Sequence, residues 1–104
     1  MQANVLHQPR VAFDAARILV NVSGARDDDL YAWYGDQLAA VLGPSYLHEL
    51  RATRKELRSS TRANTRNAEM GKWRVRLEDV LRTRAGVAES LQHLTLSATT
   101  RLTH

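Results

Sequence analysis

Apolar residues recur with the 3.6-residue period of an α-helix in four stretches, near residues 9–22, 28–42, 45–64 and 68–94. In the first stretch the apolar side is broad, which is typical of a helix packed between neighbours. The last stretch is the clearest, with apolar positions at Met70, Trp73, Leu77, Val80, Leu81, Val87, Ala88 and Leu91. We therefore predict an all-α protein, a compact bundle of about four helices with a long C-terminal amphipathic helix, in one domain of residues 1–104.

Residue types at the ends of these stretches support the predicted boundaries. Pro9 fits a first helical turn, and Ser23–Gly24 ends the first helix. Asp27–Asp29 supplies an N-cap and two acidic residues for the positive end of the second helix. Gly43–Pro44 stops that helix, and Ser45 can cap the third.

Some segments fit more than one structure. Residues 18–22 also fit a buried strand, although the alanines around them are poor strand formers. Trp73, Val75 and Leu77 alternate with charged residues as in a strand over 72–77, a pattern that fails beyond Leu77. We favour a helix for both. Residues 59–67 are mostly weak helix formers, so the third helix can fray, break or continue through them. Residues 1–8 and 96–104 are predicted to be flexible ends.

Composition narrows the class of protein. The chain has 104 residues, 43% of them apolar, and contains no cysteine. A domain of this size can bury a core without disulfides, and the lack of cysteine excludes a thiol nucleophile and cysteine-based metal sites. Residues 1–10 do not resemble a secretory leader, and no run approaches the roughly 20 apolar residues of a membrane span. We expect a cytoplasmic protein with no membrane partner.

The charges are divided unevenly along the chain. Residues 1–50 carry three arginines against six carboxylates, whereas residues 51–84 carry eleven basic residues against four carboxylates. The formal net charge is +4. Such an asymmetry indicates either an anionic partner or an attraction between the two halves of the chain.

The most organised feature is a row of arginines at intervals of four residues, Arg54, Arg58, Arg62 and Arg66, with Arg51 and Lys55 beside them. On one continuous helix these six side chains would form a stripe about 22 Å long, and no carboxylate interrupts it before Glu69. Like charges at this spacing destabilise a helix by about 0.2 to 0.5 kcal/mol per pair. Repulsion without visible compensation in the sequence suggests that a partner supplies the compensation.

Nucleic acid is the partner that we favour, because arginine binds phosphate well. Lys72, Arg74 and Arg76 would extend the same surface. The sequence has no helix-turn-helix spacing, zinc-finger ligand set or aromatic sheet motif, so contacts would be made to the backbone of DNA or RNA. The alternative is a helical module for protein interaction or homo-oligomerisation, which sets this face against carboxylates such as Asp27–Asp29 of a neighbouring copy. A basic face covered only by salt ions is the third interpretation.

Arg84 is a separate case, because it falls in the middle of the apolar side of the last predicted helix. An unpaired charge there would be strongly destabilising. We expect Arg84 either to form a structural ion pair or to lie at an interface. The candidate acidic partners are Asp14, Asp36 and Glu49.

The sequence favours a binding protein over an enzyme. The histidines have no recognised metal-ligand spacing, and the five glycines are too scattered to form a phosphate-binding loop. We therefore expect no catalytic residue, metal or cofactor. Trp33 lies at the edge of the second helix's apolar side, close to Tyr31 and Tyr34. These rings are expected in the core and at its rim, with a base-stacking or docking platform as the alternative.

Overall fold

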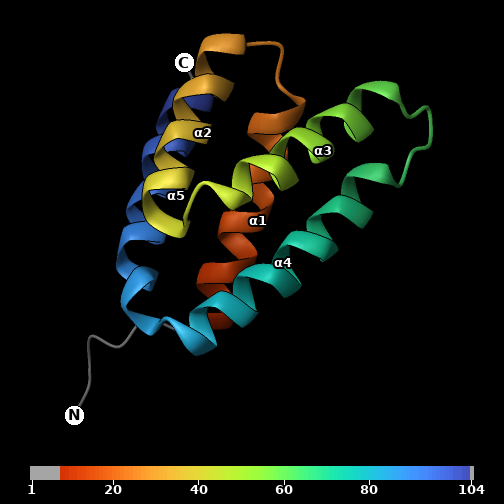
Figure 1. Cartoon of the computed structure of the whole chain (residues 1–104). Helices are drawn as coiled ribbons and strands as arrows, with labels where there is room; N and C mark the ends of the chain where they lie inside the picture. Colours follow the sequence, from red (N-terminus) through yellow and green to blue (C-terminus); the bar gives the residue numbers. More distant parts are fainter. Residues whose placement is uncertain (1–7, 104) are drawn as a thin grey trace.

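The computed structural model describes residues 8–103 (Figure 1). These residues form five α-helices and one short 3-10 helix, with no β-strand: α1 (Gln8–Gly24), α2 (Asp28–Leu42), α3 (Ser45–Ser59), α4 (Thr65–Thr83), η1 (Ala85–Val87) and α5 (Ala88–Leu102). The all-α prediction is confirmed, and residues 18–22 and 72–77 are helical rather than extended. The predicted number of about four helices is one short of the five in the described chain.

Helix α1 is the centre of the bundle and packs against α2, α3, α4 and α5. In Figure 1, α2 and α5 lie on one side of it, and α3 and α4 lie on the other. The broad apolar side of α1 explains this position, because Val11, Ala15, Leu19 and Val22 are all buried. The buried apolar residues of all the helices join in one cluster, which includes Tyr34 and Trp73.

Helix α2 has the predicted boundaries, residues 28–42. The Asp27 carboxylate accepts a 2.9 Å hydrogen bond from the Leu30 backbone N–H and caps the first turn. At the other end, Gly43 has a positive φ of 115°, and its N–H donates to the Ala39 carbonyl over 2.8 Å. A left-handed backbone favours glycine, so the local sequence fixes both ends of this helix.

The predicted helix over 45–64 is wrong at its C-terminal end, since α3 stops at Ser59. Ser60 is extended, and its side-chain oxygen accepts a 3.1 Å hydrogen bond from the Arg62 backbone N–H. The same hydroxyl contacts the hydroxyl of Thr65 at the start of α4. These local bonds compete with helical ones, as expected of a segment rich in serine, threonine and asparagine.

The predicted helix over 68–94 is also wrong, because α4 ends at Thr83 and η1 then leads into a separate helix, α5. A continuous helix of 27 residues would extend about 40 Å, whereas the break turns α5 back against α1 and α2. Helix α5 then continues to Leu102, so residues 96–102 are helical. Ala98 is fully buried and Thr95 nearly so. The other predicted flexible end is residues 1–8, of which Gln8 begins α1. Residues 1–7 and His104 lie outside the described residues.

Candidate nucleic-acid interface

The break between α3 and α4 divides the predicted arginine stripe. Arg51, Lys55 and Arg58 lie along the exposed side of α3, Arg62 lies in the turn, and Arg66 lies in the first turn of α4. All five residues are exposed. We call these five residues the basic ridge. The ridge follows an exposed helix side and a turn instead of one straight helix.

Arg54 does not belong to the ridge, because it points into the bundle. Only 9% of Arg54 is exposed, and its guanidinium is paired with the Asp28 carboxylate of α2. The guanidinium carbon also lies 3.9 Å from the centre of the Tyr31 ring, in a cation–π contact. The second terminal nitrogen, Nη1, is buried and has no hydrogen-bond partner among the described residues. Arg54 therefore joins α3 to α2, and the prediction that it lies on an exposed binding stripe is wrong.

Two ridge arginines also reach toward the end of α1. Nη2 of Arg58 lies 3.5 Å from the Asp28 carboxylate and 3.5 Å from the Ala25 carbonyl oxygen. Arg66 donates to the side-chain oxygen of Asn21. Because Arg54 and Arg58 share a single carboxylate, and because Asn21 is neutral, these contacts leave most of the positive charge of the ridge uncompensated.

Arg51, Lys55 and Arg62 make no side-chain hydrogen bond or ion pair with any described residue. The first turn of α4 adds to the positive potential beside Arg62, since Asn64 makes no side-chain cap. Backbone N–H groups at a helix start carry partial positive charge and favour anions.

The three residues predicted to extend the surface differ in their environments. Lys72 is paired with Glu69 at 3.2 Å, and Arg76 is paired with Glu49 at 3.1 Å while its guanidinium lies 5.0 Å from the Trp73 ring centre. Arg74 is exposed and has no hydrogen bond or ion pair among the described residues. Only Arg74 of these three therefore offers an uncompensated charge.

Arg84 is exposed and follows the last residue of α4, so its predicted place in the middle of an apolar helix side is wrong. No carboxylate of the described chain pairs with it. Its guanidinium instead donates to the carbonyl oxygens of Leu42, at 3.0 Å, and Val41, at 3.3 Å. These carbonyls end α2, where the helix dipole is negative, and a cation is stabilised there without a carboxylate.

A buried polar network holds α3 against α4. The sequence patterns did not predict it. The Trp73 indole N–H donates to the Thr53 hydroxyl at 2.7 Å, and that hydroxyl donates to the Glu69 carboxylate at 3.0 Å. The other Glu69 oxygen accepts from Lys72. The network fixes the two helices that bear the ridge. A threonine on the inward side of α3, close to Leu50, was the only signal in the sequence.

Residues 8–103 contain no cluster of three or more histidine, aspartate or glutamate side chains placed to hold a metal ion. Among these same residues, no helix has the length and apolarity needed to cross a bilayer.

Comparisons with known protein families, with curated proteins and with solved structures found no match for this chain.

Proposed function

We propose that this chain is a small non-enzymatic binding protein that holds nucleic acid against the basic ridge, as one subunit of a larger assembly. The observation that carries the proposal is the surplus of exposed positive charge on the ridge. Arg51, Lys55 and Arg62 form no ion pair with a carboxylate of the described residues, and Arg58 shares Asp28 with Arg54.

The arrangement favours contact with the phosphate backbone. The ridge offers guanidinium and ammonium groups along the side of one helix and around a turn, next to the uncapped start of α4. Exposed hydroxyl and amide side chains at Ser59, Thr61, Asn64 and Asn67 provide additional donors to phosphate oxygens. Nothing in this arrangement selects a base sequence, so binding is expected to depend on charge more than on sequence.

Fluorescence anisotropy with a short duplex and a short single strand, each over a salt series, tests the proposal. If four or five phosphates are neutralised, the slope of log affinity against log salt is about −4. The test variant is Arg51→Gln/Lys55→Gln/Arg62→Gln, because these three side chains make no intramolecular polar contact in the described chain. Each lost phosphate contact should make the slope less steep by about 1.

The control variant is Arg10→Glu/Arg82→Gln, which lowers the net charge by the same three units but alters exposed positions at the start of α1 and the end of α4. We expect it to keep the native salt slope. Equal loss of binding in both variants would show that only net charge matters and would refute the ridge. A native protein that binds neither probe at low salt would refute the proposal itself.

A further inference from the structure

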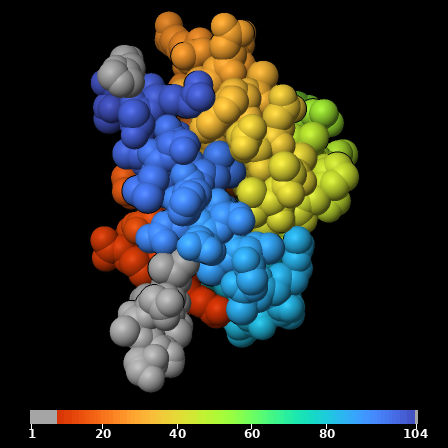
Figure 2. Space-filling model, turned by 90° about the vertical axis from the view of Figure 1, so that its left-hand side faces the viewer, coloured from red at the N-terminus to blue at the C-terminus, as the bar shows by residue number. Residues whose placement is uncertain are grey.

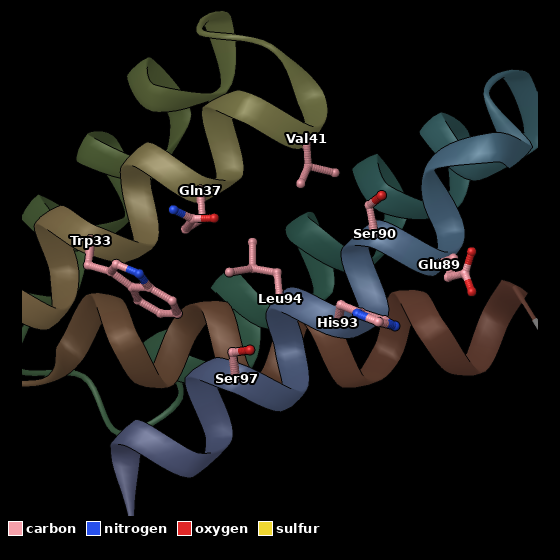
Figure 3. A pocket seen from close by; sticks show the side chains of 8 residues that line it. All are labelled: Trp33, Gln37, Val41, Glu89, Ser90, His93, Leu94 and Ser97. Atoms are coloured by element: carbon pink, nitrogen blue, oxygen red, sulfur yellow. The ribbon is translucent and has the colours of Figure 1, made fainter.

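A groove of about 480 Å³ runs between α2 and α5, on the face shown in Figure 2. Trp33, Gln37 and Val41 line it from α2, and Glu89, His93 and Leu94 line it from α5 (Figure 3). The floor is apolar at Leu94, which is buried in the core cluster. The guanidinium group of Arg101 lies over the Trp33 ring, with its central carbon 3.9 Å from the ring centre.

The charges around this groove are mostly negative. Asp29 and Asp36 lie on α2 about one turn before and after Trp33, and Glu89 lines the groove itself. All three are exposed, and none is paired with a basic residue of the described chain. Helix α2 contains no basic residue. The groove is therefore apolar in its floor and lined by one unpaired carboxylate, with two more nearby on α2, which disfavours phosphate and favours a cationic partner.

A surface of the opposite character lies on α1 and α4. Phe13 and Val75 are large apolar residues that remain 41% and 61% exposed. Phe13 lines a shallow hollow together with Met70 and Arg74, and Val75 follows Arg74 on α4. Arg17, one turn after Phe13, and Arg74 are exposed and unpaired among the described residues. We call Phe13, Arg17, Met70, Arg74 and Val75 the α1/α4 patch.

We propose that the α2/α5 groove of one copy of this chain binds the α1/α4 patch of a second copy. Exposed Phe13 and Val75 would cover the apolar floor of the groove, while Arg17 and Arg74 would face Asp36 and Glu89. The charges of the two surfaces are complementary, since unpaired carboxylates lie in and near the groove and unpaired arginines belong to the patch.

The two surfaces come from different helices, so one molecule can use both at once. Such an interface is heterologous: it joins copies head to tail, and it forms rings or open chains instead of closing at a two-fold dimer. Because the contact is made partly of surface ion pairs, it weakens as salt screens them.

Charge reversal tests this pairing. The patch variant is Arg17→Glu/Arg74→Glu, and the groove variant is Asp36→Lys/Glu89→Lys. The fourfold variant that combines both has the native formal net charge of +4. Mass is measured by analytical ultracentrifugation without nucleic acid, over a concentration series at low and high salt, against a monomer mass of 11.7 kDa. Circular dichroism establishes that each variant is folded.

At low salt we expect the native protein to exceed the monomer mass, and each twofold variant alone to lose this association. An equal mixture of the two twofold variants should associate again, because each supplies a surface that fits the other. The fourfold variant should also regain association. A native protein that stays monomeric at every concentration would overturn the proposal, and so would a folded fourfold variant that stays monomeric.

Val75→Asp is a second patch variant at a position that is already mostly exposed, for use if the reversed patch does not fold. It should likewise abolish association, and native association in this variant would overturn the pairing. The ridge variant Arg51→Gln/Lys55→Gln/Arg62→Gln keeps the groove and the α1/α4 patch, so it should associate like the native protein. Failure of nucleic-acid binding and failure of self-association are thus separate results.

Discussion

Arg54 provides the sharpest test of the structure, because it belongs to the same sequence pattern as the ridge but has a different role. Changing Arg54 to alanine removes the cation–π contact with Tyr31, worth about 1 to 2 kcal/mol when largely desolvated. It also removes two buried methylene groups, worth about 1.6 kcal/mol. The pair with Asp28 adds less than about 1 kcal/mol, because 83% of the Asp28 side chain is exposed and solvent screens it.

One contribution has the opposite sign. Nη1 of Arg54 is buried with no partner in the described part of the chain, and removing it recovers about 1 to 3 kcal/mol of desolvation penalty. The expected net effect of Arg54→Ala is a loss of about 2 kcal/mol from the free energy of unfolding, against a total of about 5 to 15 kcal/mol for a small domain. Arg54→Met keeps most of the apolar stem and removes the unpaired nitrogen, so we expect it to unfold close to the native midpoint.

Urea unfolding followed by circular dichroism measures these effects. Arg51→Ala is the matched control, since Arg51 lies one turn away on the exposed side of α3, and its midpoint should not change. In the anisotropy assay the order reverses: Arg54→Met should bind nucleic acid like the native protein, and Arg51→Ala should bind more weakly. Equal urea midpoints for Arg54→Ala and Arg51→Ala would refute the structural role of Arg54.

Two further predictions concern the core. Burial raises the pKa of the Tyr34 phenol well above its ordinary value, and within residues 8–103 its oxygen has no hydrogen-bond partner. The unfolded chain therefore loses this proton first, and the native protein should lose about 1.4 kcal/mol of stability per pH unit above roughly pH 10 on account of this group. Tyr34→Phe should reduce that decline in a pH series of urea unfolding, and an unchanged decline would contradict the assignment. Thr53→Val leaves the Trp73 indole N–H and one Glu69 oxygen without a partner, which should lower stability by about 2 to 4 kcal/mol, whereas Thr53→Ser should be much milder. A native urea midpoint in Thr53→Val would show that water replaces the hydroxyl.

Local signals in the sequence predicted the parts of the fold that local chemistry determines. The boundaries of α2 are right because Asp27 caps its start and Gly43 adopts a left-handed conformation at its end. The break at residues 84–87 has a much weaker signal, since Gly86 and the β-branched Val87 only mildly disfavour a helix and the apolar spacing continues through the break. Packing of α5 against α1 and α2 determines that break, and a periodicity argument does not detect it.

The arginine row shows the same limit for the candidate site. The four-residue spacing predicts the same exposure for Arg54 and Arg58, but Arg54 is buried and Arg58 is exposed in α3. The partner of Arg54, Asp28, lies twenty-six positions earlier in the chain. The charge asymmetry did indicate an attraction between the two halves, and the pairs of Asp28 with Arg54 and of Glu49 with Arg76 confirm it in part. Which residues pair depends on the packing of α2, α3 and α4.

The uneven distribution of charge over the bundle affects both the ridge and the α2/α5 groove. Helices α2 and α5 together carry four carboxylates against Arg101, whereas residues 45–83, which include α3 and α4, carry ten basic residues against five carboxylates. A polyanion is attracted to the ridge and repelled from the α2/α5 groove, so the groove stays free for the cationic patch of another copy. Copies joined head to tail would then present several ridges to one nucleic acid, and multiple attachment would raise apparent affinity without any new contact at a single ridge. On this reasoning, a weak ridge on a small domain suffices for binding when the copies assemble.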